Sequence, residues 1–262
     1  MIDNGSGPLL AIESVSKAFG GVQALSDITF HVHSGMVMGL IGPNGAGKTT
    51  LFNVITGAYP ADTGRIIFEG TRIRSRKTHE VVGLGVARTF QNVELFESMT
   101  VLENVMVGRH IRTRSGFWGA MTRLPRVLRE EAEIREKSFK LLEFVGLQDE
   151  AHRRSGDLPF GWQRLLEIAR ALASDPKLLL LDEPAAGLNA VETGQLGELL
   201  NRIRERGVTL MLVEHDMSLT MKVSDRIVVL DQGCMLAEGN PREVQTDEAV
   251  MAAYLGGGHA SN

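Results

Sequence analysis

The hydrophobic pattern near the start of the chain is that of short β-strands. Residues 9–15 and 28–32 are partly alternating apolar runs bounded by glycine and serine, as strands commonly are. Residues 36–41 form a continuous apolar run between two glycines, which favours a strand that is covered on both faces. After a glycine-rich turn, residues 48–56 predict a helix and residues 65–68 predict another strand.

The pattern changes between residues 100 and 147, where strand signals fade and helical ones dominate. Ile134, Leu141, Leu142 and Val145 fall at i, i+7, i+8 and i+11, which places them on one face of a helix. Charged residues fill most of the other positions from 129 to 140. The pattern predicts a helical subdomain inserted into an α/β core.

The last third of the chain returns to alternating helices and strands. Its predicted helices are 163–173, 192–205 and 217–223, and its predicted strands are 177–181, 209–213, 226–230 and 235–237. The last two strands form a predicted hairpin around Asp231-Gln232-Gly233. The small, polar residues 256–262 predict a flexible tail.

Composition narrows the class of protein. The 262 residues carry 28 Lys+Arg and 32 Asp+Glu, a formal net charge of −4, with 43% apolar residues. These values exclude a disordered, collagen-like or disulfide-stapled chain, and the acidic balance argues against a dedicated nucleic-acid binder. The single cysteine, Cys234, fits a reducing compartment. No run approaches the roughly 18 apolar residues of a membrane span, so we expect a soluble cytosolic chain, whatever it docks onto.

A glycine-rich loop between a predicted strand and a predicted helix carries the strongest chemical signal. Residues 42–49 fit the pattern G-x-x-x-x-G-K-[ST]. Its glycines let backbone N–H groups turn inward at a helix N-terminus, where they cradle phosphates. Lys48 adds a charge facing the β- and γ-phosphates, and the Thr49 hydroxyl can ligate Mg²⁺. The predicted ATP-binding residues of this loop are Gly42, Pro43, Asn44, Gly45, Ala46, Gly47, Lys48, Thr49 and Thr50.

Two acidic residues follow an apolar strand later in the chain. Residues 178–181 are all leucine, and Asp182 and Glu183 come directly after them. Ligands bind at the carboxyl ends of strands in open α/β sheets, so both carboxylates are expected at such an edge. Asp182 would hold Mg²⁺, and Glu183 would orient and polarise the attacking water.

The order of motifs resembles the nucleotide-binding subunit of ABC transporters over roughly residues 9–239. The motifs are the phosphate loop, Gln91, residues 158–164, Asp182-Glu183, Ala186-Gly187-Leu188-Asn189 and His215. The resemblance implies an α/β fold: a P-loop NTPase (RecA-like) core with an N-terminal antiparallel β subdomain and an inserted α-helical subdomain. It implies one ABC ATP-binding domain at 9–255, with the helical subdomain at about 92–162 and a flexible tail at 256–262.

Further segments resemble the branched-chain amino acid importer branch, and within it the larger of the two ATP-binding subunits. They are residues 87–91, 165–170, 182–189, 213–217 and 253–256, with the arginine-rich stretch 109–129. The resemblance implies an ATPase that uses ATP and Mg²⁺ to drive import of branched-chain or related amino acids. Its implied partners are a second ATP-binding subunit, identical or not, two transmembrane permease subunits and, indirectly, a periplasmic solute-binding protein. The implied location is peripheral, on the cytoplasmic face of the inner membrane.

The resemblance also implies roles for single residues. Gln91 matches a glutamine that touches Mg²⁺ and the lytic water, and His215 matches a histidine that contacts the γ-phosphate. Phe19 stands where an aromatic ring, commonly tyrosine, stacks on adenine, and Asn189 stands where the family often has aspartate. The implied catalytic residues are Glu183, His215, Gln91 and Lys48, and the implied metal ligands are Thr49, Gln91 and Asp182.

The segment matching the family's signature departs from L-S-G-G-Q. It is implied to contact ATP across a dimer through Leu158, Pro159, Phe160, Gly161, Trp162 and Gln163. Pro159 replaces a residue with a hydroxyl and an N–H, while proline is acceptable at a helix start. Trp162 stands where a small polar side chain is usual. Whether this signature supports full activation across a dimer is left open by the sequence.

Other classes of nucleotide-binding protein fit these motifs less well. A soluble ABC ATPase of repair or translation usually has two cassettes or a long coiled-coil insert, and this chain has neither. A GTPase or nucleotide kinase leaves the signature and switch segments unexplained. A non-hydrolysing regulatory subunit conflicts with intact Lys48, Asp182, Glu183 and His215. The stretch 109–129 holds six arginines and no acid, which fits either a solvated face or a surface near anionic lipid or an acidic partner loop.

Overall fold

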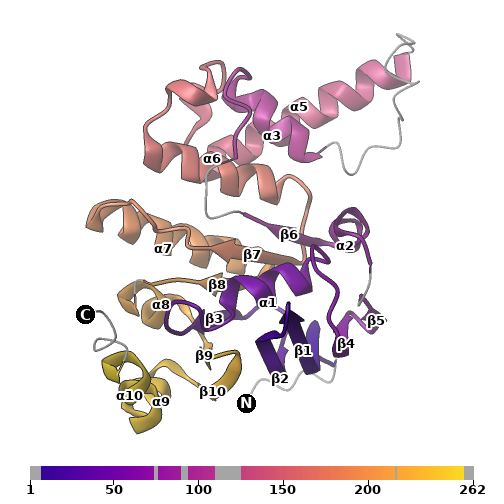
Figure 1. Cartoon of the computed structure of the whole chain (residues 1–262). Coiled ribbons are helices and arrows are strands. Elements are labelled where there is room, and N and C mark those ends of the chain that lie inside the picture. The colour runs from indigo at the N-terminus through magenta and orange to yellow at the C-terminus, as the bar shows by residue number, and fades with distance from the viewer. Residues whose placement is uncertain (1–6, 74–75, 90–93, 110–124, 216, 257–262) are drawn as a thin grey trace.

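The computed structural model describes residues 7–73, 76–89, 94–109, 125–215 and 217–256. Its elements form layers, with a helical layer at one end of the molecule and a sheet across the middle (Figure 1). A second sheet lies at the opposite end, and the two helices α9 (Pro241–Thr246) and α10 (Glu248–Gly256) pack against the strand Cys234–Gly239 of the central sheet (Figure 1). No helix within the described ranges is long and apolar enough to cross a membrane.

The central sheet holds six strands among the described residues. They are β3 (Val37–Ile41), β6 (Val86–Arg88), β7 (Leu178–Asp182), β8 (Thr209–Val213), β9 (Arg226–Asp231) and β10 (Cys234–Gly239). Their order is β10-β9-β3-β8-β7-β6, and all neighbours are parallel except the hairpin β9–β10. Every residue of β3, β7 and β8 is buried, as their continuous apolar runs predict.

The second sheet is antiparallel, with strand order β2-β1-β4-β5. Its strands are β1 (Leu10–Phe19), β2 (Val22–Val32), β4 (Thr63–Phe68) and β5 (Thr71–Arg72). Residues of β1, β2 and β4 share one hydrophobic cluster with β3 and with helix α1 (Lys48–Ile55), which follows β3. The predicted N-terminal antiparallel β subdomain is therefore confirmed, and its core is continuous with that of the central sheet.

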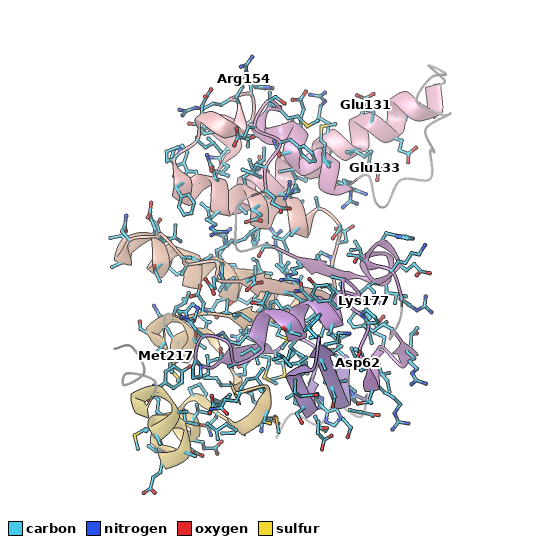
Figure 2. The ribbon with its side chains drawn as sticks, viewed as in Figure 1. Asp62, Glu131, Glu133, Arg154, Lys177 and Met217 are labelled. Carbon is cyan, nitrogen blue, oxygen red and sulfur yellow. The ribbon has the colours of Figure 1, made fainter. Side chains whose placement is uncertain are left out.

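The helical layer consists of α3 (Val101–Arg109), α5 (Pro125–Val145) and α6 (Phe160–Leu172), which pack on one another. Ile134, Leu142 and Val145 of α5 are buried together and Leu141 packs against the same cluster, which confirms the predicted apolar face. Glu131 and Glu133 lie on the exposed outer part of that helix (Figure 2). Helix α6 packs in this layer and extends to Leu172. The predicted subdomain at about 92–162 describes a domain boundary, and it stays a prediction.

Several outcomes concern element boundaries. Helix α8 (Met217–Val223) matches its prediction, while α7 (Ala190–Glu205) begins two residues before the predicted start at 192 and α6 begins three residues before the predicted start at 163. Helix α6 starts early because the Pro159 carbonyl already accepts the N–H groups of Trp162 and Gln163. The predictions omitted α2 (Thr78–Leu84), β5, β6, α9 and α10, and two 3₁₀ turns, Gln148–Glu150 and Ser155–Asp157. Of the predicted tail, Gly256 ends α10, and residues 257–262 lie outside the described residues.

One aromatic side chain joins the helical layer to the core. Phe144, near the end of α5, is buried. The guanidinium groups of Arg202 and Arg206 lie 4.5 Å and 3.4 Å from its ring centre, and both come from the end of α7 or just after it. Arg202 also donates to the Phe144 carbonyl at 2.7 Å. Stacking of this kind combines apolar burial with a cation–π contribution.

We therefore expect Phe144→Ala to destabilise the protein by about 3–5 kcal/mol, the usual cost of removing a buried phenylalanine. Urea unfolding followed by circular dichroism measures the change in free energy. Phe139→Ala on the same helix is the matched control because its ring is partly exposed, and a surface change of this kind costs roughly 0.5 kcal/mol or less. Equal losses for the two variants would contradict the joining role of Phe144.

Candidate ATP-binding and hydrolysis site

The phosphate loop leads from β3 into α1 through three glycines that no other residue can replace without strain. Gly42, Gly45 and Gly47 have φ angles of +152°, +80° and +103°. A Cβ on Gly42 would lie 2.1 Å from the Leu230 carbonyl oxygen, and one on Gly47 would lie 2.6 Å from that of Ala24. Both obstacles are backbone atoms, so glycine is required for conformation and for space.

The phosphate loop also forms hydrogen bonds with two segments that are distant in sequence, the β9–β10 hairpin and α10. The N–H of Gly233, at the tip of the β9–β10 hairpin, donates to the Ala46 carbonyl at 3.1 Å, and its own carbonyl accepts from Ser26 at 2.7 Å. From α10, Tyr254 forms a hydrogen bond with the Gly42 backbone. Partial burial raises the pKa of Tyr254, and this hydrogen bond opposes the rise.

Lys48 lies inside the loop and is buried. Its Nζ donates to the carbonyls of Gly42 at 2.7 Å and Pro43 at 3.0 Å. Burial lowers the pKa of Lys48, and the nearby carboxylates of Glu183 and Asp182 oppose that shift. The ammonium group is thus held beside the phosphate-binding backbone with two acidic groups close by.

Glu183 and His215 meet at the carboxyl edge of the central sheet. His215 Nε2 lies 2.8 Å from Glu183 Oε1, and the imidazole is half exposed while the carboxylate is mostly buried. Glu183 has φ +50°, a left-handed conformation that is uncommon outside glycine. Its N–H donates to the Val213 carbonyl at 2.8 Å, which anchors it to the end of β8.

A cavity of about 200 Å³ brings these groups together. Its described lining comprises Ala24, Asn44, Gly45, Ala46, Gly47, Lys48, Thr49, Thr50, Glu183 and His215. Thr49 is exposed, so its hydroxyl is open to a ligand. The predicted phosphate loop and the side chains of Glu183 and His215 therefore line one cavity.

Asp182 forms an ion pair with Arg88, a residue that has no predicted role. Arg88, at the end of β6, places its guanidinium 2.7 Å from Asp182 Oδ2, and both side chains are almost fully buried. Arg88 also donates to Asn53 Oδ1 of α1 at 2.6 Å. In the sequence, Arg88 is visible only as a charged residue at the end of a short apolar run. Its partner becomes clear once β6 is known to pair with β7.

Other predicted site residues lie apart from the cavity or outside the description. Gln91 falls in residues 90–93, outside the described residues. Phe19, at the end of β1, is partly exposed and its ring meets that of Tyr59 edge-on at 5.2 Å. It is not part of the described cavity lining. Its proposed stacking on adenine stays a prediction.

The signature segment starts α6, and none of its described residues lines the cavity. Pro159 takes the N-cap position, Phe160 and Trp162 are partly exposed, and Gln163 Nε2 donates to the Leu158 carbonyl at 3.0 Å. The Phe160 ring covers Gly187, where a Cβ would lie 2.8 Å from it. The described signature residues of a chain are therefore not part of the cavity beside its own phosphate loop.

Fold and site together define the class of protein. A parallel sheet that carries a glycine-rich loop before a helix, with two acidic residues at the end of another strand of that sheet, defines a P-loop nucleoside triphosphatase. The model of the ABC transporter family matches residues 25–186. The chain therefore belongs to the ABC transporter ATP-binding family and is an ATPase. A model described as the branched-chain amino acid ATP-binding cassette transporter matches residues 234–260.

Relatives agree along almost the whole chain. The high-affinity branched-chain amino acid transport ATP-binding protein BraF of Pseudomonas aeruginosa is 43% identical, over 96% of this chain and 99% of its own. The corresponding protein LivG of Escherichia coli strain K12 is 40% identical over the same shares. The ADP conformation of MJ1267, an ATP-binding cassette of an ABC transporter, superposes with a TM-score of 0.84 at 33% identity and covers 96% of this chain and 100% of its own.

Removing the guanidinium of Arg88 should be costly because it leaves the buried Asp182 carboxylate without its charge partner. We expect Arg88→Ala to lower the free energy of unfolding by about 3–5 kcal/mol. The control is Arg65→Ala, which breaks the exposed Arg65–Glu13 pair and should cost about 1 kcal/mol or less. Both are measured by urea unfolding, and a small loss for Arg88→Ala would show that Asp182 is stabilised by other groups.

Proposed function

We propose that the protein is the ATP-hydrolysing subunit that powers import of branched-chain or related amino acids by an ABC transporter complex. The observation that carries the proposal is the shared cavity of Lys48, Glu183 and His215 within the phosphate loop. The choice of solute is supported by relatives whose names specify branched-chain amino acid transport and by the match of residues 234–260.

In this proposal each residue has a defined task. The backbone of the loop and Lys48 hold the phosphates of ATP, and Glu183 orients and polarises the attacking water. His215 contacts the γ-phosphate while its hydrogen bond to Glu183 keeps the two groups together. Gln91 is assigned to the same water and to the metal.

Mg²⁺ is proposed as the cofactor, with Thr49 and Asp182 as protein ligands. A hydroxyl and a carboxylate are oxygen donors of the kind that Mg²⁺ prefers, and it usually takes few protein ligands together with substrate phosphates. In keeping with this, the described residues contain no cluster of three or more His, Cys, Asp or Glu that could hold a metal alone. When bound, Mg²⁺ neutralises charge on the phosphates.

We propose further that two cassettes act together. The described signature residues do not line the cavity of their own chain, and Phe160 and Trp162 at the start of α6 are partly exposed. A second, identical or similar, subunit would then bring its α6 N-terminus to the γ-phosphate. The positive end of that helix dipole favours an anion, even though Pro159 offers no N–H.

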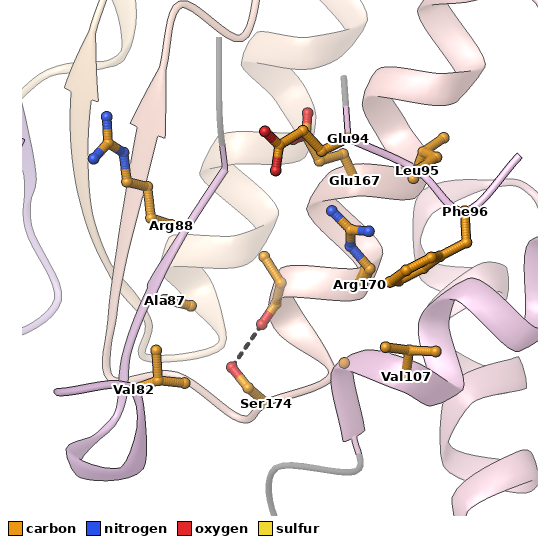
Figure 3. Close-up of a pocket in the computed structure, with 12 residues that line it drawn as sticks. Val82, Ala87, Arg88, Glu94, Leu95, Phe96, Val107, Glu167, Arg170 and Ser174 are labelled. Carbon is orange, nitrogen blue, oxygen red and sulfur yellow. Dashed lines mark hydrogen bonds between the residues drawn. The ribbon is translucent and has the colours of Figure 1, made fainter. Parts of the chain in front are cut away.

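Two permease subunits are the proposed membrane partners, on the cytoplasmic face of the inner membrane. A groove of about 670 Å³ separates β6 from the helical layer and is the proposed docking place (Figure 3). Its walls include Leu95, Phe96, Glu94, Glu167 and Arg170 (Figure 3). Burial lowers the pKa of Arg170, and Glu167 and Glu94 oppose that shift. A segment docked there would lie between β6, which bears Arg88, and the helical layer, whose helix α6 bears the signature.

The complex isolated from membranes tests this assignment. We expect two permease subunits and a second ATP-binding subunit to co-purify with the protein, and reconstituted vesicles to accumulate labelled leucine only with ATP and the solute-binding protein. ATPase activity should rise when the permease subunits are present. Uptake of another solute class would reject the amino-acid assignment, and complete absence of hydrolysis would favour a regulatory subunit.

Glu183→Gln should keep ATP binding and lose turnover, because the amide preserves shape but removes the base. The loss of a positioned base costs about 10²–10⁴ in rate. Phosphate release in a single turnover measures the chemical step, and calorimetry measures ATP affinity. Single-turnover hydrolysis at the wild-type rate in this variant would rule out the assigned role of Glu183.

Pro159→Ser tests the signature. In the hydrolysis-deficient Glu183→Gln background, we expect serine to strengthen ATP-dependent dimerisation with the native partner, because it supplies a hydroxyl and an N–H where proline has neither. A charge-assisted hydrogen bond contributes roughly 1.5–3 kcal/mol. Sedimentation with and without ATP measures the dimer. No gain would mean that position 159 serves only as the helix start and that contact with the γ-phosphate relies on Gly161 and the helix end.

A further inference from the structure

The buried carboxylate of Glu214 lies between the loop that carries Glu183 and the loop that carries His215. Glu214 follows β8 directly, precedes His215, and is 4% exposed. Its Oε1 accepts the N–H of Ala185 at 2.6 Å, and its Oε2 accepts the N–H of His215 at 3.1 Å. Ala185 is two residues after Glu183, so the two oxygens of one side chain are bonded to both loops.

These loops depend on such support because neither is regular secondary structure. Glu183 has a left-handed backbone, and His215 reaches it only through a half-exposed imidazole at 2.8 Å. Hydrogen bonds from backbone N–H groups to an ionised carboxylate are short and about twice as strong as neutral ones. In a buried setting a bond of this kind fixes the position of both donors.

We propose that Glu214 is a positioning residue for ATP hydrolysis: its carboxylate sets the separation of the Ala185 and His215 backbones, and so aligns the Glu183 carboxylate with the His215 imidazole. This inference rests on the proposed function, since it takes the roles of Glu183 and His215 from there. Glu214 is not part of the described cavity lining and therefore acts through its neighbours.

The variant Glu214→Gln tests whether the Glu214 carboxylate positions Glu183 and His215 or only occupies volume between their loops. The amide has the same shape but only one oxygen, and its NH₂ group would face a backbone N–H, so one loop is released. Displacement of a reacting group by about 1 Å can reduce a rate about 10²-fold. We expect kcat to fall roughly 10- to 100-fold, with ATP affinity unchanged within about twofold. Glu214→Asp keeps both oxygens and should recover part of the rate.

A double-mutant cycle provides the decisive measurement. If Glu214 acts by aligning His215 with Glu183, then Glu214→Gln should lower the rate about threefold or less when His215 is already alanine, because coupled residues are not additive. The matched control is Glu243→Gln, which alters a carboxylate that accepts the Asn240 N–H at 2.7 Å in α9, far from the cavity in sequence. It should retain the wild-type kcat.

The outcomes are distinct. A wild-type kcat for Glu214→Gln, a full multiplicative loss with His215→Ala, or a drop in kcat matched by an equal drop in ATP affinity would each overturn the positioning role. If Glu214→Gln does not fold, Glu214→Asp in the same cycle decides the matter. Wild-type hydrolysis by both Glu183→Gln and His215→Ala would instead overturn the proposed function, and the inference with it.

Discussion

The backbone of the phosphate loop passes so close to its neighbours that no side chain fits between them. Gly42 lies against the Leu230 carbonyl, and Gly47 lies against that of Ala24. These contacts join β3 and α1 to β9 on one side and to β2 of the antiparallel sheet on the other. The cavity, the orientation of Lys48 and the placement of α1 all follow from this packing, because protein interiors leave little room for adjustment.

Charge at the sheet edge is arranged around that fixed frame. Asp182 is paired with Arg88, Lys48 is surrounded by carbonyls and faces two acids, and Glu183 contacts His215. Each buried charge has a partner at hydrogen-bond distance, which is the condition under which such groups are tolerated. A nucleotide brings negative charge to this edge and its metal brings positive charge. We therefore expect the existing charge pairs to rearrange when both bind.

The sequence allowed the long apolar strands, the phosphate loop and the acidic strand end to be predicted, since each depends on local pattern. It did not show Arg88 as the partner of Asp182, because that contact depends on which strand lies beside β7. Glu214 was equally hidden, as its two donors come from different loops. Short elements such as β6 and α2 have too few residues for a periodic signal. The start of α6 directly after Pro159 could have been anticipated from the proline, which is acceptable at a helix start.

The hairpin tip has a consequence for biosynthesis. Gly233 completes the hydrogen bonds of Ala46 and Ser26, and Leu230 closes one wall of the loop. A nascent chain on the ribosome therefore makes its phosphate loop early but cannot give it its final shape until nearly 190 further residues have been translated, as the difference between positions 46 and 233 requires. Contacts of such long range form late in folding. The complete phosphate-binding backbone therefore depends on residues that are translated late.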